Sequence, residues 1–246
     1  MSRNKLARFE EIKYFDNVVQ APFHLMSEKN FYLRGSWAAK YFRNSNPIIL
    51  EIGCGRGEYS VALAEKNPDK NYIGIDIKGA RLWKGAKAAL DKELDNVAFL
   101  RTHVEIINKF FAPDEVETIW ITFPDPQMKK YSKRLTSTVF IDRYRKILKP
   151  GGTIHLKTDS RFQFIYSSSL AHLNGFEVLV ETSDLYNSDF LDDTLIIKTY
   201  YEKQWLSRGI AIKYISFRLN NKDLKEPDIV IEKDSYRSFG RSARVN

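Results

Sequence analysis

Two turns of this 246-residue sequence combine acidic side chains with glycine or proline in a way that suits chemistry. The first turn, EIGCGRGEYS, places glycines at 53, 55 and 57 just after Glu51. Glycine permits a tight turn that lets the backbone approach a ligand, and the following helix N-terminus favours a negative group. The second turn, FPDPQMKKYSKRL, holds Asp125 between two prolines and continues into lysine and arginine. This pairing indicates a ligand site that adjoins a cationic surface.

The first turn favours a cationic cofactor over a dinucleotide. Its glycines follow G-x-G-x-G instead of G-x-G-x-x-G, and the acid Glu51 would repel a pyrophosphate. The same acid suits the amino group and sulfonium of S-adenosylmethionine. Asp76, at the predicted end of the next strand, is placed to accept the hydroxyls of an adenosine ribose. The alternative for either acid is a helix cap or a lysine partner, and Cys54 is interpreted as a small filler, since no neighbour in sequence would lower its pKa.

Apolar strand-like runs alternate with helix-period segments, which predicts an α/β fold with a Rossmann-like, mostly parallel sheet of seven strands and helices on both faces. The predicted strands are 48–53, 71–77, 97–103, 117–126, 153–159, 176–182 and 211–219. Helices are predicted at about 58–66, across 79–94 and at 140–148, the last from the spacing of Phe140, Tyr144, Ile147 and Leu148 before Pro150. Residues 1–46 are interpreted as a basic, aromatic arm with a short helix at 36–43, 47–219 as the main domain, and 220–246 as a polar, basic tail.

Charge and composition indicate which kinds of binding partner and site this sequence favours or excludes. A formal net charge of +8 and a pI near 9.3 favour a polyanion such as nucleic acid. From Lys129 to Lys149 there are eight basic residues and one acid, which indicates a phosphate-binding approach beside Asp125. One cysteine excludes an intrachain disulfide, and no cysteine or histidine spacing suggests a metal site. No apolar run approaches the roughly 20 residues of a membrane span, so we expect a cytoplasmic protein with no membrane partner.

Five motifs, taken in order, resemble the bacterial tRNA (guanine-N7)-methyltransferase family: LEIGCGRGEYS, YIGIDIKG, FPDPQMKKYSKRL, LKPGGTIHLKTD and TYYEKQW. The resemblance covers about residues 47–218, and the FPDP element with its lysine and K-R pair is its specific part, because many Rossmann-like methyltransferases share the glycine turn. It implies the fold of a class I methyltransferase and transfer of the S-adenosylmethionine methyl group to N7 of a guanine in the tRNA variable loop, position 46. The implied partner is tRNA, with no metal and no obligate protein partner, in a monomer or homodimer.

The resemblance also implies site residues, matched position by position. Cofactor contacts fall on Glu51, Gly53, Gly55, Asp76, His103 and Asp125, with Asp125 as the catalytic residue. Contacts to guanine and tRNA fall on Lys129, Asp159, Thr199, Tyr201 and Glu202. Two positions depart from the family: His103 replaces an Asp or Asn that meets the adenine, and Gln127 replaces a Trp after FPDP. Further candidates for phosphate contacts are Lys5, Arg8, Lys13, Arg237, Arg241 and Arg244.

The implied chemistry explains the absence of an evident base or nucleophile. Guanine N7 is a bare lone-pair acceptor, so attack on the methyl group needs no proton removal and depends on placement. Asp125, Asp159 or Glu202 would hold the guanine N1 and N2 donors and offset the charge that develops on the ring, and the sequence leaves the choice open. The alternative for Asp159 is a helix N-cap, and for Thr199 to Glu202 a helix start with an exposed acid.

Four other functions have to be compared with this one. Amino-methyltransferases usually carry [DN]-P-P-[FYW], whereas Asp125-Pro126 here leads into Gln127-Met128. A pyrimidine C5 methyltransferase needs a cysteine nucleophile near its substrate, and Cys54 lies on the cofactor side. Glu51 and the glycine spacing disfavour a nicotinamide dehydrogenase. A non-catalytic RNA-binding protein with the same fold would be recognised by its failure to bind S-adenosylmethionine.

Overall fold

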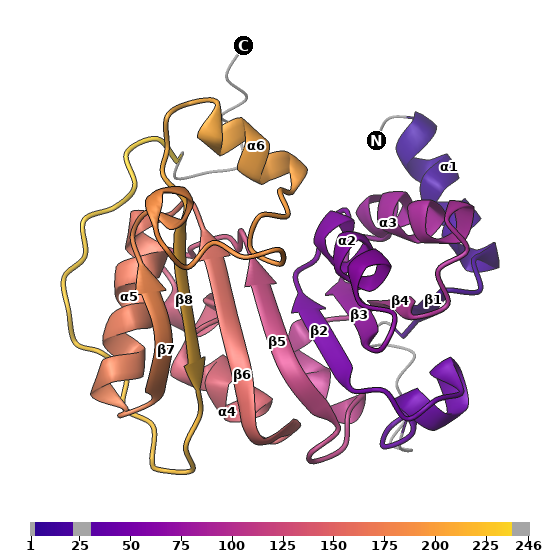
Figure 1. Ribbon diagram of the computed structural model, residues 1–246, viewed down its shortest axis with the longest axis horizontal. Helices are drawn as coiled ribbons and strands as arrows, with labels where there is room; N and C mark the ends of the chain where they lie inside the picture. Colours follow the sequence, from indigo (N-terminus) through magenta and orange to yellow (C-terminus); the bar gives the residue numbers. More distant parts are fainter. Residues whose placement is uncertain (1–2, 22–30, 238–246) are drawn as a thin grey trace.

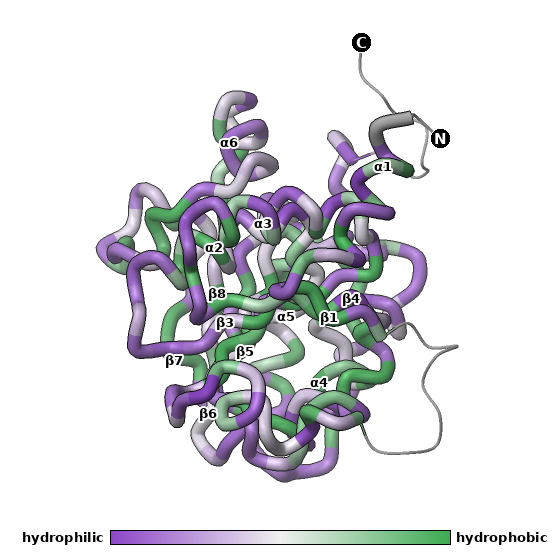
Figure 2. The backbone as a smooth tube through the Cα atoms, turned by 90° about the vertical axis from the view of Figure 1, so that its right-hand side faces the viewer, coloured by the Kyte–Doolittle hydropathy of each residue, from purple (hydrophilic) through white to green (hydrophobic). Residues whose placement is uncertain are grey.

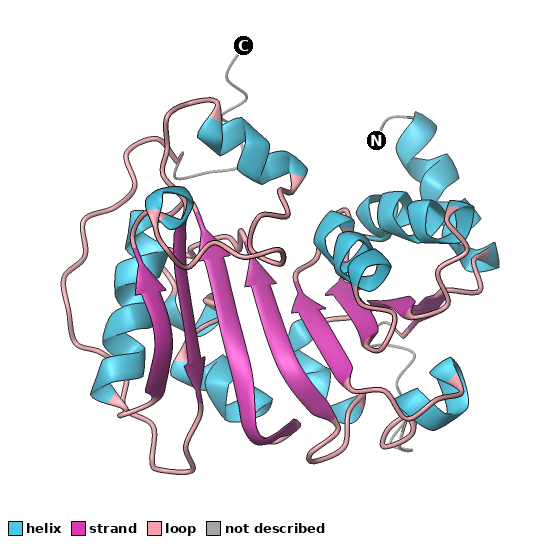
Figure 3. Ribbon diagram, viewed as in Figure 1, coloured by secondary structure: helices cyan, strands magenta, loops and turns pink. Residues whose placement is uncertain are grey.

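The computed structural model describes residues 3–21 and 31–237, and an eight-stranded sheet forms its centre (Figures 1 and 3). The strands are β1 Val18–Gln20, β2 Ile48–Ile52, β3 Asn71–Asp76, β4 Val97–Arg101, β5 Val116–Thr122, β6 Leu148–Thr158, β7 Glu177–Thr182 and β8 Lys213–Arg218. Their spatial order is β1-β4-β3-β2-β5-β6-β8-β7. The pairs from β1 to β6 are parallel, and β8 is antiparallel to both β6 and β7.

All seven predicted strands are present, which confirms the predicted fold, but the sheet has an eighth strand in the N-terminal arm. This strand, β1, runs parallel to β4, with Val18 opposite Phe99 and Gln20 opposite Arg101. It is only three residues long. So short a strand shows no readable alternation of polar and apolar residues, and its pairing partner lies far along the chain. The predicted boundaries of arm, main domain and tail remain a prediction.

The helices are α1 Arg3–Glu11, α2 Glu58–Lys66, α3 Gly79–Asp91, α4 Thr138–Tyr144, α5 Arg161–Leu173 and α6 Tyr200–Leu206. Shorter helical segments are η1 Ile12–Tyr14, η3 Trp37–Phe42, η4 Val104–Lys109, η5 Tyr131–Lys133 and η6 Leu185–Asn187, of which η3 is the predicted helix of the arm. The helix predicted at 140–148 was too long. It ends at Tyr144, and Leu148 already opens β6 opposite Val116. Ile147 and Leu148 share the spacing because they are buried in the same core as α4.

The core has two layers, one on each face of the sheet. Alternate residues of β2 (Ile48, Leu50 and Ile52) pack in a cluster with α4 and α5, while Ile49 faces a cluster with α2 and α3. Figure 2 shows mainly hydrophobic chain along the central strands and mainly hydrophilic chain in the outer loops and α6. None of the described helices is long and apolar enough to cross a membrane.

The strand order indicates which edge of the sheet is expected to bind a ligand. The order reverses between β2 and β5, and ligands of such sheets bind at the carboxyl ends of the strands beside this reversal. The glycine turn follows β2, the FPDP turn follows β5, and Asp159 follows β6 at the same edge. The helix α6 lies above this edge in Figure 1.

Candidate active site

The glycine turn after β2 is tied to the end of β3. Gly53, Gly55 and Gly57 have φ angles of 72°, 56° and 65°, which side chains disfavour. A Cβ on Gly57 would also lie 2.3 Å from the Phe99 ring, so the space itself requires glycine. Asp76 fixes the turn, because its Oδ2 accepts the backbone N–H of Gly55 at 3.0 Å.

Glu51 lies beneath this turn and is 3% exposed. Its Oε2 accepts the backbone N–H of Ser60 at 2.9 Å and the Ser60 hydroxyl at 2.5 Å, and its Oε1 accepts the Thr122 hydroxyl at 2.6 Å. Burial raises the pKa of Glu51 to about 7, although these hydrogen bonds oppose the rise. Cys54 is also buried, and burial raises the pKa of its thiol well above the ordinary value, which disfavours a thiolate nucleophile.

The FPDP turn holds its acid in an unusual stretch of backbone. Phe123 and Gln127, at its two ends, have φ angles of 49° and 45°, a left-handed conformation uncommon outside glycine. Such conformations concentrate at functional sites. Asp125 is exposed, and its Oδ1 accepts the backbone N–H of Gln127 at 3.0 Å. The turn therefore presents a carboxylate to solvent from a constrained position.

Two adjoining cavities bring most of the predicted residues together. A cleft of about 520 Å³ is lined by Gly53, Asp76, His103 and Asp125, together with Lys130 and Lys133. A smaller cavity of about 70 Å³ is lined by Gly53, Gly55, Thr199 and Tyr201. Gly53 lines both cavities. Predicted cofactor residues and predicted substrate residues thus meet at the glycine turn.

The start of α6 is pinned to the sheet by a buried acid. Thr199 and Glu202 form a capping box, in which the Thr199 hydroxyl accepts the Glu202 N–H and Glu202 accepts the Thr199 N–H. Glu202 is fully buried, so the alternative of an exposed acid is wrong. Its Oε1 lies 2.8 Å from Nζ of the fully buried Lys157, which also donates to the carbonyls of Leu195 and Ile197 at 2.7 and 2.9 Å. Sequence reasoning missed Lys157, whose only signal is a lysine inside the apolar strand TIHLKTD.

Asp159 is fully buried as well, in contact with the end of the described chain. Both its carboxylate oxygens accept from the guanidinium of Arg237. The N-cap of α5 is Ser160, whose side chain accepts the Gln163 N–H at 2.9 Å, so the interpretation of Asp159 as an N-cap is wrong. Of the other candidate phosphate contacts, Arg241 and Arg244 lie outside the described residues.

The basic run after FPDP does not form one continuous cationic face. Lys129, Lys130 and Lys133 are exposed. Arg134 is buried over the Phe162 and Tyr166 rings and donates to the Gln127 carbonyl at 3.3 Å, so it supports the FPDP turn. Further along, Arg145 and Lys146 pair with Asp142. The cationic part of the site is therefore the group of three lysines, of which Lys133 pairs with Glu105 at 3.1 Å.

An exposed aromatic pair stands beside the smaller cavity. Tyr200 and Tyr201 are 41% and 37% exposed, with ring centroids 5.6 Å apart. The guanidinium of Arg56 lies over the Tyr200 ring at 4.0 Å. Exposed aromatic rings and a stacked arginine are suitable partners for unpaired nucleobases.

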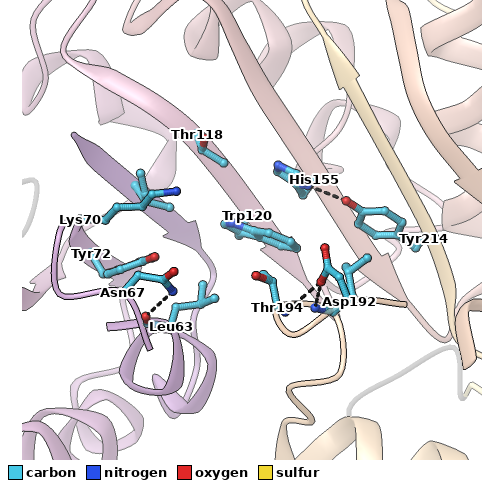
Figure 4. A pocket seen from close by; sticks show the side chains of 12 residues that line it. Leu63, Asn67, Lys70, Tyr72, Thr118, Trp120, His155, Asp192, Thr194 and Tyr214 are labelled. Atoms are coloured by element: carbon cyan, nitrogen blue, oxygen red, sulfur yellow. Dashed lines mark hydrogen bonds between the residues drawn. The ribbon is translucent and has the colours of Figure 1, made fainter. Parts of the chain in front are cut away.

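A third cavity, of about 200 Å³, lies on the sheet face shown in Figure 4. There His155 stacks on Trp120 with ring centroids 4.0 Å apart, and its Nδ1 is 2.7 Å from the Tyr214 hydroxyl. Burial lowers the pKa of His155 to about 3. His155 is therefore uncharged near neutral pH, and we interpret this cluster as packing beneath the loop that carries Asp192 and Thr194.

Comparisons with known proteins identify similar methyltransferases. A family model described as "Putative methyltransferase" matches residues 45–215. A tRNA (guanine-N(7)-)-methyltransferase of Bacteroides fragilis is 54% identical over 99% of this chain and 97% of its own, and one of Porphyromonas gingivalis is 55% identical over 94% and 96%. Among solved structures, the 16S rRNA methyltransferase KamB has a TM-score of 0.57 at 13% identity, covering 77% of this chain and 95% of its own, which supports the fold.

Proposed function

This chain belongs to the tRNA (guanine-N7)-methyltransferase family, and from that premise we propose that it transfers a methyl group from S-adenosylmethionine to N7 of guanine 46 in the tRNA variable loop. The observation that carries the proposal is the position of Gly53, which lines both the large cleft and the small cavity that contains Thr199 and Tyr201. Donor and acceptor of a methyl group have to meet at such a junction.

The residues of the cleft fit S-adenosylmethionine. Its volume, about 520 Å³, lies within the range of roughly 300–1,000 Å³ typical of small-molecule sites. Asp76 would hold the ribose hydroxyls, and His103 lines the side of the cleft where the adenine would lie. Glu51, under the glycine turn, would favour the cationic groups of the cofactor. When bound, the cofactor supplies an electrophilic methyl group; the protein's part is to hold both reactants in line.

Asp125 and Glu202 differ in their availability to a base. Asp125 is exposed and accepts one hydrogen bond from the Gln127 backbone, so we assign it the position next to the methyl group and the guanine. Glu202 is fully buried, with contacts from Lys157, Tyr186 and Thr199, so we assign it the role of holding the start of α6. A carboxylate beside the ring also offsets the positive charge that N7-methylation creates.

The surface around the junction would hold the RNA. Lys129, Lys130 and Lys133 would contact phosphates, and Tyr200 and Tyr201 would stack on bases exposed near the target. A guanine in a structured loop has to leave its stack to reach the cleft, so a stacking partner beside the small cavity has a clear use.

The test is methyl transfer from labelled S-adenosylmethionine to an unmodified tRNA transcript, with the position read by cleavage at N7-methylguanine. A transcript with adenine at position 46 is the matched control. Label on the first transcript and none on the second supports the activity and the site. Binding of tRNA without cofactor binding would instead indicate a non-catalytic RNA-binding protein, and label at an exocyclic amine would indicate an amino-methyltransferase.

A further inference from the structure

The chain after β8 returns to the candidate active site. Residues 219–237, called here the C-terminal segment, contain no helix or strand and run up the outer side of the molecule in Figure 1. Near the middle of this segment, Glu226 accepts from the hydroxyls of Thr138, at 2.7 Å, and Tyr166. At its end, Asp234 accepts the backbone N–H of Phe162 at 3.1 Å and the Ser160 hydroxyl. The segment is thereby fastened to the first turn of α5, next to Asp159.

Two residues of this segment, Tyr236 and Arg237, donate hydrogen bonds to Asp159. The Nε of Arg237 donates to Oδ2 at 3.0 Å and its Nη2 donates to Oδ1, which makes a two-point contact. The Tyr236 hydroxyl donates to the Asp159 carbonyl at 2.8 Å. The Trp205 ring of α6 supports both, with Tyr236 at 5.5 Å and the Arg237 guanidinium at 5.3 Å from its centroid. The Asp159 side chain is 0% exposed.

The Arg237 contact has the geometry of guanine recognition. Guanine carries N1–H and N2–H on one carbon, the same planar N–C–N arrangement as a guanidinium, and both groups suit the two oxygens of a carboxylate. Asp159 leaves the sheet at the end of β6, beside the Phe123 backbone N–H, which donates to the Lys157 carbonyl at 2.8 Å. Asp159 thus stands at the same edge as Asp125, with both oxygens already used.

We propose that Arg237 occupies the guanine-binding positions of Asp159 in the enzyme without tRNA, and that the target guanine displaces it. This inference rests on the proposed function. A buried carboxylate without a partner is costly, so Arg237 keeps Asp159 satisfied until a base with the same pair of donors replaces it. Displacement of Arg237 also moves the C-terminal segment away from Trp205.

The first experiment compares Arg237→Gln with the wild type in steady-state methyl transfer to a tRNA transcript. If Arg237 competes with guanine, its removal lowers KM for tRNA roughly tenfold, the change expected if about nine-tenths of the free enzyme is closed, and leaves KM for S-adenosylmethionine unchanged. Arg161→Gln is the matched control, because Arg161 is an exposed arginine that pairs with Glu232 of the same segment. An unchanged or raised KM in Arg237→Gln, relative to this control, overturns the proposal.

The second experiment needs no variant. Hydrogen exchange of peptides covering residues 234–237 and 160–163 is followed in the full chain with S-adenosylhomocysteine, with and without unmodified tRNA. Faster exchange of the 234–237 peptide upon tRNA binding supports displacement, because the backbone N–H of Arg237 donates to the Asp234 carbonyl at 3.2 Å and loses this contact when Arg237 leaves Asp159. The 160–163 peptide shows whether the contact of Asp234 to the Phe162 N–H opens as well. Equal or slower exchange contradicts it, and this reading holds even if Arg237→Gln does not fold.

Methyl transfer by the wild type and KM of Arg237→Gln together distinguish a wrong displacement from a wrong function. If the wild type methylates the tRNA at the target guanine but Arg237→Gln raises KM, the function stands and the displacement is wrong. If the wild type labels neither transcript, the proposed function itself is wrong, and the displacement loses its premise.

Discussion

Lys157 and Glu202 form an ion pair of 2.8 Å in which neither side chain is exposed to solvent. The pair joins β6 to the first turn of α6, and the remaining donors of Lys157 go to the Leu195 and Ile197 carbonyls of the intervening loop. Burial lowers the pKa of Lys157, while the charge of Glu202 opposes this fall. The position of Thr199 and Tyr201 at the small cavity therefore depends on a charge pair that no substrate has to touch.

The first prediction concerns the strength of this pair. Lys157→Met leaves the Glu202 carboxylate buried without its cation, so we expect a loss of about 3–5 kcal/mol in the free energy of unfolding, measured by urea denaturation. Adding Glu202→Gln to that variant removes the uncompensated charge and recovers part of the loss. The exposed Lys87–Asp91 pair of α3, at 2.9 Å, is the control, and its double-mutant cycle should give a much smaller coupling, because solvent screens an exposed pair. Equal coupling in both cycles would contradict the assignment.

The second prediction is a pH dependence of cofactor binding that comes from Glu51. Its pKa in the folded chain is raised from 4.5 to about 7, so the carboxyl is largely protonated at pH 6 and largely ionised at pH 8. A cationic ligand favours the ionised form, so the affinity for S-adenosylmethionine should rise about tenfold over this interval, with proton release. Calorimetry in buffers of different ionisation enthalpy measures both quantities.

Glu51→Gln provides the control for this titration, because the ligand's own ionisation is common to both proteins. The amide keeps an acceptor for Ser60 but does not titrate, so the pH dependence due to Glu51 should vanish. The sign for stability is opposite to that for binding. Between pH 4.5 and about 7 the folded chain holds a proton that the unfolded chain has released, so Glu51 makes folding less favourable as pH rises through this window. A wild-type stability that rises with pH there, relative to Glu51→Gln, would argue against the raised pKa.

The third prediction separates chemistry from folding at the FPDP turn. Asp125→Asn keeps an oxygen for the Gln127 N–H but removes the charge, so kcat/KM for methyl transfer should fall on the order of a hundredfold. Because Asp125 is exposed, the unfolding midpoint should stay within the range of ordinary surface substitutions. Asp91→Asn, on the exposed face of α3, is the control and should leave kcat/KM unchanged. A large loss of stability in Asp125→Asn would give the acid a structural role instead.

The fourth prediction tests base stacking beside the small cavity. Tyr201→Leu removes an aromatic face, and we expect KM for tRNA to rise about fivefold or more, in line with the value of one stacked base. Tyr201→Phe retains the ring and should behave like the wild type. Tyr14→Leu is the control at an exposed tyrosine of η1 that is 83% exposed. If Tyr201→Phe loses as much as Tyr201→Leu, the hydroxyl matters and the stacking role is wrong.

The elements that surround the site were readable from the sequence because each has a local signal. The glycine turn, Asp76 and the FPDP turn lie at the ends of β2, β3 and β5. The apolar residues of these strands are enough to predict them from the sequence. What the sequence could not show were the partners of the acids. Glu202 is buried against Lys157, 45 positions earlier (202 − 157), and Asp159 against Arg237, 78 positions later. Such long-range pairs leave no periodicity, and a charged residue in an amphipathic segment usually indicates solvent instead of a buried partner.

The strand order has a consequence for synthesis of the chain. The last of the described strands along the chain, β8, lies between β6 and β7 and pairs with both. Until residue 218 has left the ribosome, β6 exposes an unpaired edge and β7 has no neighbour in the sheet. The sheet that carries the candidate active site therefore cannot form step by step as the chain is synthesised. Such an open edge is a site for pairing with other chains. Truncation before β8 should therefore yield aggregation instead of a smaller folded enzyme.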